Sequence, residues 1–290
     1  MDQRTLGHIF KKIGGIHLKK GIRLFSLGFF LLCLSTLLIA CGSDSKESSK
    51  STTEPADTEE NTDNKEVTKL VVGTDATYAP MESVDKDGNI VGIDIDIVKA
   101  IAEEVGVEVE FKNIGWEPLF PAVDNEEVDF AVSSITITED RKKSFDFTDP
   151  YYVANQVILV PEDSDIESAA DLEDKRSSAQ INTTGHIVLQ DLLGKTSKDI
   201  VAAETMPLAI SEMLNGNADA SVGDNSTVNE YIKNNAGVDV KVIEDDSFEK
   251  EYYGLMVKKG NTEMIDLLNK GIQGIKDNGK LKEIIGHDIE

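Results

Sequence analysis

The sequence has 290 residues, of which 40% are hydrophobic and 6% aromatic, so it can bury one or two ordinary cores. Its 54 acidic residues outnumber its 29 basic residues and give a formal net charge of -25. A surface this acidic repels the phosphate backbone, which excludes nucleic acid as a favoured partner.

The first 40 residues have the pattern of a secretory signal peptide. A positively charged segment ending at Arg23 precedes an apolar run from Leu24 to Ala40. The alternative is a permanent transmembrane anchor, because the run approaches the length that spans a bilayer. However, the run ends in LIACG at residues 38–42, which resembles a bacterial lipobox. We therefore expect a lipoprotein signal peptide over 1–40 and a lipid anchor, with palmitate, on Cys41.

The cysteine count agrees with this interpretation. The chain has two cysteines, Cys33 inside the apolar run and Cys41, so cleavage would leave one lipidated thiol and no disulfide. His186 and His287 would be the only histidines of the mature chain, which is too few for a His/Cys zinc cluster. We expect no metal and no cofactor.

Residues 41–68 are rich in Ser, Thr, Glu and Asp and carry no periodic apolar residues. Such a segment cannot bury enough apolar surface to offset its ordering entropy. We interpret it as a flexible tether that holds the folded domain near the membrane. A merely flexible terminus is the alternative.

From Leu70 onward, short β-branched segments alternate with helical patterns. Residues 70–72 predict a strand, and apolar residues at every fourth position from Ile93 to Val105 predict a helix that ends at Gly106. Further strands are predicted over 107–111, 128–132, 157–160, 218–222, 238–242 and 254–257, further helical segments over 119–125 and 264–275, and a short intervening segment over 168–172. This alternation predicts an α/β fold with largely parallel pairing.

Four ordered motifs give the chain a resemblance to a known family. They are GTDATYAPME at 73–82, GIDIDIVKAIA at 92–102, SSITITEDR at 133–141 and FDFTDPYY at 145–152. Together they resemble the family 3 extracellular solute-binding proteins, which are the polar amino-acid-binding proteins of ABC transporters. The likeness covers nearly everything from Leu70.

The resemblance implies a two-lobed periplasmic-binding-protein fold of type II with two hinge crossings. The first lobe would comprise residues 69–150 and 254–290, the second lobe 156–248, and the hinges 151–155 and 249–253. Periplasmic binding proteins close around their ligand by hinge motion. The ligand would therefore lie in the cleft between the lobes.

The resemblance also implies which residues contact the ligand. Arg141 would pair with the ligand carboxylate, which its planar guanidinium suits, and Thr183 and Thr184 would assist from the second lobe. Asp224 would meet the ammonium, with Thr136 and the Ser134 carbonyl as helpers. The candidate ligand-binding residues are Asp75, Tyr78, Trp116, Ser133, Ser134, Thr136, Arg141, Thr183, Thr184 and Asp224.

Each of these residues has a plainer interpretation. Arg141 would otherwise form a surface ion pair with Glu139 or Asp140, and Thr183 would be a helix N-cap. Asp224 would be a turn or cap residue. Tyr78 and Trp116 would be packing residues, with Trp116 in a loop-like setting. Asp75 would either read a cationic or amide side chain of the ligand or only fix its own loop.

The chain departs from the family pattern at three positions. Asn182 stands where many relatives have Gly, Ser178 replaces a small Gly or Ala, and Met81 replaces a common aromatic residue. Asn tolerates positive φ better than other non-glycine residues, so we expect the loop at Asn182 to be preserved.

These observations predict an amino-acid-binding lipoprotein on the outer face of the bacterial cell membrane. We expect a monomer that binds a polar or charged amino acid, such as Gln, Glu, Arg, Lys, His or cystine, and delivers it to ABC permease subunits. An enzyme is the first alternative, because the same fold occurs among secreted dehydratases, but no Ser-His-Asp or Cys-His set is evident. An amino-acid sensor is the second.

Overall fold

The structure is a computed structural model that describes residues 68–289. The predicted signal peptide, Cys41 and all but the last residue of the predicted tether lie outside the described residues. Between residues 68 and 289, none of the helices combines the length and the apolar character needed to cross a bilayer.

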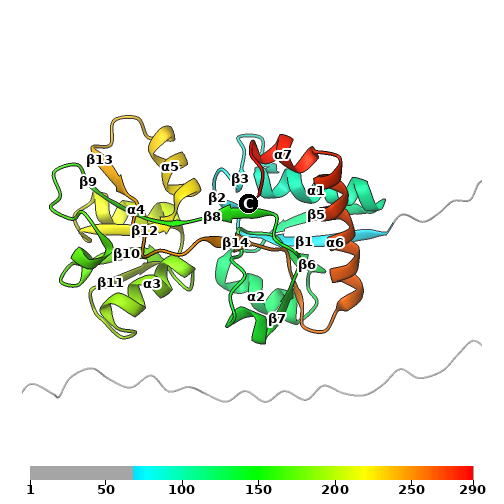
Figure 1. Cartoon of the computed structure of the whole chain (residues 1–290), viewed down its shortest axis with the longest axis horizontal. Helices are drawn as coiled ribbons and strands as arrows, with labels where there is room; N and C mark the ends of the chain where they lie inside the picture. Colours follow the sequence, from blue (N-terminus) through cyan, green and yellow to red (C-terminus); the bar gives the residue numbers. More distant parts are fainter. Residues whose placement is uncertain (1–67, 290) are drawn as a thin grey trace, which may run out of the picture. The chain divides into compact units, whose positions relative to one another are not determined.

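The first lobe is built on a five-stranded sheet in the order β5-β1-β6-β15-β7 (Figure 1). Its strands are β1 (Lys69–Thr74), β5 (Glu108–Asn113), β6 (Phe130–Ala131), β7 (Phe145–Phe147) and β15 (Met256–Lys258). β1 pairs in parallel with β5 and β6, whereas β15 pairs antiparallel with β6 and β7. The second half of this sheet is therefore antiparallel.

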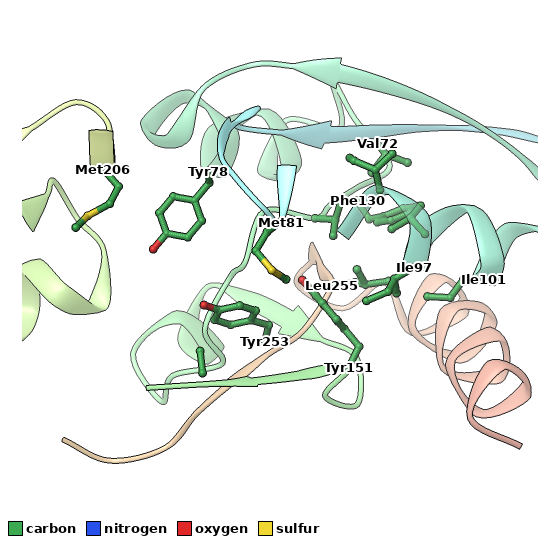
Figure 2. Packing of buried hydrophobic residues seen from close by; sticks show 14 of the residues in the cluster. Val72, Tyr78, Met81, Ile97, Ile101, Phe130, Tyr151, Met206, Tyr253 and Leu255 are labelled. Atoms are coloured by element: carbon green, nitrogen blue, oxygen red, sulfur yellow. The ribbon is translucent and has the colours of Figure 1, made fainter. Parts of the chain in front are cut away.

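Four helices belong to this lobe. They are α1 (Ile93–Val105), α2 (Trp116–Asp124), α6 (Thr262–Asp277) and α7 (Lys280–Ile285). Ile97 and Ile101 on the inner face of α1 are fully buried and share one core with Val72 and Phe130 of the sheet (Figure 2). Gly106 ends α1 in the left-handed conformation, with φ 74°. The predicted helix and its end at Gly106 are thus confirmed, and of the four residues that predicted it, Ile97 and Ile101 are buried whereas Ile93 and Val105 are half-buried.

A small three-stranded sheet lies in the chain between β1 and α1. It consists of β2 (Thr77–Tyr78), β3 (Glu82–Val84) and β4 (Ile90–Val91). Gly92 connects it to α1 with φ 138°, and a Cβ at this position would lie 2.2 Å from the Met81 carbonyl oxygen. Only glycine fits this junction. Met81 itself is fully buried in the same core as Tyr151 and Leu255 (Figure 2).

The second lobe repeats this design with a sheet in the order β11-β10-β12-β9-β13. Its strands are β9 (Gln156–Pro161), β10 (Ser177–Gln180), β11 (Ile200–Ala203), β12 (Ala220–Asp224) and β13 (Val240–Ile243). Its helices are α3 (Thr184–Leu193), α4 (Met206–Leu214) and α5 (Asn225–Asn234), with the 3-10 helix η2 (Ala169–Leu172) before β10. Ser178 is buried in β10, where its hydroxyl donates to the Ala209 carbonyl at 2.7 Å.

Two short strands carry the chain between the lobes. It leaves the first sheet after β7 and reaches β9 through β8 (Tyr152–Ala154). It returns from β13 to β15 through β14 (Glu251–Tyr253), which pairs antiparallel with β8 (Figure 1). The rings of Tyr152 and Tyr253 stack across this pair, 5.4 Å apart. The fold is thus two-lobed with two crossings.

The prediction of largely parallel pairing is wrong. In the second sheet, as in the first, two pairings are parallel and two are antiparallel. The antiparallel pairs involve β9 and β15, the first strands after each crossing. A strand that enters from the other lobe needs no helical crossover to reach its neighbour, so antiparallel pairing is open to it.

Candidate functional site

A cavity lies between the two lobes. Its lining comprises Asp75, Tyr78, Trp116, Ser133, Ser134, Thr136 and Arg141 of the first lobe and Gln180, Thr183, Thr184 and Asp224 of the second. The structure therefore brings all ten candidate ligand-binding residues together around one space. Gln180 is an addition that sequence reasoning missed, because a glutamine at the end of a strand carries no distinctive signal.

Arg141 opens the 3-10 helix η1 (Arg141–Lys143), and its guanidinium faces the cavity. Nη1 donates to the Thr136 carbonyl at 2.9 Å, and Nη2 donates across the lobes to the Asn182 carbonyl at 3.3 Å. The guanidinium also lies over the Trp116 ring, 5.3 Å from its centroid. Burial lowers the pKa of Arg141 to about 10, which leaves it charged at neutral pH.

The surface ion pair considered for Arg141 is not what the structure shows. Glu139 pairs instead with Lys142 at 2.8 Å, and Asp140 pairs with Lys143 at 2.7 Å. These exposed pairs turn the acids away from Arg141.

The second lobe presents the start of α3 to the cavity. Asn182 has φ 58°, as its tolerance of positive φ led us to expect. Thr183 is the N-cap of α3 and accepts a hydrogen bond from the His186 amide at 3.3 Å, which confirms the capping interpretation. Thr184 is the first helical residue. Free N–H groups at a helix start favour an anion, so capping and anion binding are compatible.

Asp224 ends β12 and is buried at the cavity wall. It precedes α5, but its side chain makes no capping hydrogen bond, so the cap interpretation does not describe its role. Instead its carboxylate accepts hydrogen bonds from Gln156 and from the Tyr253 hydroxyl. Burial, together with the negative charge of Glu251, raises the pKa of Asp224 to about 6.

Asp75 also lines the cavity and is 3% exposed. It accepts from the Thr77 hydroxyl at 2.9 Å and from Gln180 Nε2 at 3.2 Å. Its own amide donates to the Ser133 hydroxyl at 3.0 Å. Burial raises the pKa of its carboxyl group. Asp75 therefore fixes its loop and also presents a desolvated acid to the cavity.

Tyr78 and Trp116 are both buried at the cavity wall. We expected a loop-like setting for Trp116, but it is the first residue of α2. Gly115 before it has φ 87°, which lets the chain turn into the helix directly at this position. The two aromatic residues therefore both pack and line the site.

Glu251, on the return crossing, is a second site residue that sequence reasoning missed. One of its oxygens accepts from the Thr136 hydroxyl at 2.6 Å and from the Thr184 hydroxyl at 2.7 Å. The other oxygen accepts from Gln156 Nε2 at 3.0 Å. A single carboxylate thus joins donors of both lobes. The sequence marked this position only as part of a crossing.

The charged lining of the site suits the capture of a small polar molecule. Across residues 68–289, no cluster of three or more His, Cys, Asp or Glu side chains is arranged to hold a metal ion. The cavity lining includes one cation, Arg141, and two buried acids, Asp75 and Asp224. Such an arrangement can neutralise a molecule that carries charges of both signs.

Comparison with known proteins places the chain in a family. Residues 70–287 match the bacterial extracellular solute-binding proteins, family 3. A probable histidine-binding protein of Neisseria gonorrhoeae is 34% identical over 256 residues, which cover 88% of this chain and 91% of that protein. The arginine-binding extracellular protein ArtP of Bacillus subtilis is 30% identical over 259 residues, covering 87% and 92%. Both relatives are binding proteins rather than enzymes.

Solved structures of amino-acid-binding proteins also resemble this chain. The arginine-, lysine-, histidine-binding protein ArtJ of Geobacillus stearothermophilus has 43% identity and a TM-score of 0.73, covering 77% of this chain and 97% of that one. An ancestral amino acid-binding protein described as a precursor of cyclohexadienyl dehydratase has 36% identity and a TM-score of 0.68, covering 75% and 93%. On this evidence, the chain belongs to family 3 of the bacterial extracellular solute-binding proteins.

Proposed function

We propose that this protein captures a free amino acid with a cationic side chain between its lobes and delivers it to an ABC importer. The observation that carries the proposal is the placement of the half-buried Arg141 and the buried Asp224 in the lining of one cavity. A free amino acid must bring a carboxylate and an ammonium out of water. Each loses its hydration in doing so, and this loss is unfavourable unless the site supplies an opposite charge.

Arg141 is the proposed partner of the carboxylate. A guanidinium has five N–H donors, of which two serve the carbonyls of Thr136 and Asn182, so further donors can form a paired contact with a carboxylate. The start of α3 at Thr183 and Thr184 faces the same space from the second lobe. Asp224 is the proposed partner of the ammonium.

The side chain of the ligand would extend toward Asp75. A larger open cavity adjoins the first one, because Asp75 and Trp116 line both. Among the residues that line it, Glu117 and Glu204 add two more acids, and the described lining includes no Lys, Arg or His. A long cationic side chain would find negative charge here. Relatives named for binding arginine and histidine support the same class of ligand.

Closure of the lobes would occur by hinge motion. We propose lobes over 69–150 with 254–290 and over 156–248, joined by hinges at 151–155 and 249–253. Direct hydrogen bonds support a closed arrangement, because Gln180 donates to Asp75 at 3.2 Å and Asn182 donates to Glu117 at 2.5 Å.

We further propose that the chain is a monomeric lipoprotein at the outer face of the cell membrane. The support is the lipobox-like segment before Cys41 and the extracellular character of the family. A Cys41→Ser variant is expected to move from the membrane fraction to the soluble fraction. Retention in the membrane would favour a transmembrane anchor instead.

Calorimetric titration against the common amino acids tests the proposed function. We expect arginine or lysine to bind most tightly and acidic amino acids to bind weakly. Mass spectrometry of the recovered ligand is expected to show no chemical conversion. A protein that binds no amino acid, or that converts one, would contradict the proposal.

A further inference from the structure

Two completely buried carboxylic acids, Glu82 and Asp94, contact Ser133 and Ser134 of the cavity lining. Glu82 is the first residue of β3, and Asp94 lies in the first turn of α1. Both side chains are 0% exposed. A buried carboxylate is unfavourable unless a counter-charge or a proton neutralises it.

The two carboxyl groups accept three hydrogen bonds, from donors in the cavity lining and in the first crossing. Glu82 Oε1 accepts from the Ser133 hydroxyl at 3.1 Å. Asp94 Oδ2 accepts from the Ser134 amide at 2.7 Å and from the Tyr151 hydroxyl at 3.0 Å. Each acid is thus connected to the loop that follows β6.

The remaining oxygens, Glu82 Oε2 and Asp94 Oδ1, are buried and receive no hydrogen bond from any donor in the described part of the chain. The two acids are held side by side, because the Asp94 amide donates to the Met81 carbonyl at 3.0 Å and because the residues that bind them, Ser133 and Ser134, are adjacent in the chain. Two ionised carboxyl groups can only accept hydrogen bonds and repel each other, so burial of both favours a proton on one of them.

The surroundings favour retention of that proton. The titratable groups that act on the pair are Asp75 from the loop after β1 and Tyr151 and Tyr152 from the first crossing, none of which can carry a positive charge. Burial and the neighbouring carboxyl raise the pKa of Glu82 well above its usual range. Burial raises the pKa of Asp94 to about 6.

We propose that Glu82 and Asp94 share one proton at neutral pH and that this neutral, rigid pair positions both first-lobe ligand loops. The contacts form a continuous path. The Ser133 hydroxyl that donates to Glu82 also accepts the Asp75 amide at 3.0 Å. Asp94 holds the Ser134 amide, and Ser134 has the uncommon φ of 48°. The role in ligand binding rests on the proposed function, whereas the shared proton does not.

Two substitutions at Glu82 distinguish the effect of the shared proton from the effect of side-chain packing. In Glu82→Gln, the side-chain amide can donate to Asp94 permanently, so it reproduces the protonated acid. Glu82→Met keeps the length of the side chain but removes both the donor and the acceptor. Glu108→Gln makes the same chemical change as the first variant at an exposed position of β5 and serves as the control.

The first measurement is urea unfolding of the ligand-free proteins from pH 5 to pH 7. A folded-state pKa raised above the unfolded value means that stability is lost as pH rises. We expect the unfolding constant of wild type, relative to Glu82→Gln, to increase about tenfold per pH unit between about pH 5 and 7. The Glu108→Gln variant is expected to follow wild type. Parallel curves for wild type and Glu82→Gln would overturn the shared proton.

The second measurement is amide hydrogen exchange at residues 133–136, also without ligand. We expect wild-type protection in Glu82→Gln and at least about tenfold faster exchange in Glu82→Met. Equal protection in all three proteins would overturn the positioning role. Because neither measurement uses an amino acid, a failure of the proposed function would be recognised separately, as an absence of binding in wild type.

Discussion

Asp75 of the first lobe accepts a hydrogen bond from Gln180 of the second lobe, with 3.2 Å between Oδ2 and Nε2. Both side chains are buried, and Gln180 Nε2 also donates to the Glu204 carbonyl at 3.2 Å. The bond therefore joins the residue proposed to read the ligand side chain to the opposite lobe.

Removal of this connection should weaken ligand binding. For Gln180→Ala we expect about a tenfold loss of arginine affinity in calorimetry, because a hydrogen bond to a charged group contributes about 1.5–3 kcal/mol. Gln273→Ala, on an exposed part of α6, is the matched control. Unchanged affinity in Gln180→Ala would show that this interlobe bond contributes nothing to the bound state.

Asp75 should determine the charge preference of the site. In Asp75→Asn, the carboxylate is replaced by an amide of the same shape. We expect arginine affinity to fall about thirtyfold or more, while glutamine affinity changes by less than about threefold. Competition titrations with the two amino acids measure the ratio. An equal loss for both would assign Asp75 to loop structure alone.

Asp224 should reduce the stability of the ligand-free protein at neutral pH. Its pKa is raised to about 6, so the folded state keeps a proton that the unfolded state loses near pH 4. The stability from this group therefore declines as pH rises from about 4 to about 6. We expect Asp224→Asn to be about 1–2 kcal/mol more stable than wild type at pH 7 and equal to it near pH 4.

Denaturant unfolding at the two pH values measures this difference, and a constant offset between the proteins would contradict it. The same titration should affect binding. As pH falls below about 6, Asp224 gains a proton and no longer offers its charge to the ammonium, so arginine affinity should decrease.

Gly92 should be irreplaceable at the start of α1. A Cβ there would lie 2.2 Å from the Met81 carbonyl oxygen, and φ is 138°. We expect Gly92→Ala to lower the free energy of unfolding by at least about 2 kcal/mol. Gly88→Ala is the control, because Gly88 also has positive φ but has no neighbour within 4 Å of the added Cβ. Equal losses in the two variants would show that the close contact does not matter.

Short sequence patterns predicted those helices and strands that pack their apolar residues against the main core of a lobe. Apolar residues at every fourth position from Ile93 to Val105 predicted α1, and Gly106 predicted its end. Both signals depend only on residues that are near one another in the chain. Six of the ten candidate site residues could be named because they lie in the motifs at 73–82 and 133–141, and the family resemblance implied the other four. The cavity then brings those residues together.

Features that depend on distant parts of the chain were not predictable in this way. The antiparallel pairing of β9 and β15 follows from the crossings, which leave no periodic pattern. Glu251 and Gln180 are ordinary polar residues in the sequence, and only the meeting of the lobes makes them part of the site. Glu82 likewise becomes unusual only through its burial next to Asp94.

The central claim is that Arg141 binds the carboxylate of a free amino acid. Agmatine, which is arginine without its carboxylate, provides the matched ligand for calorimetry with wild type and Arg141→Ala. We expect the substitution to weaken arginine by about a hundredfold or more and agmatine by less than about threefold. Wild-type affinity for arginine in Arg141→Ala, or an equal loss for both ligands, would contradict the claim.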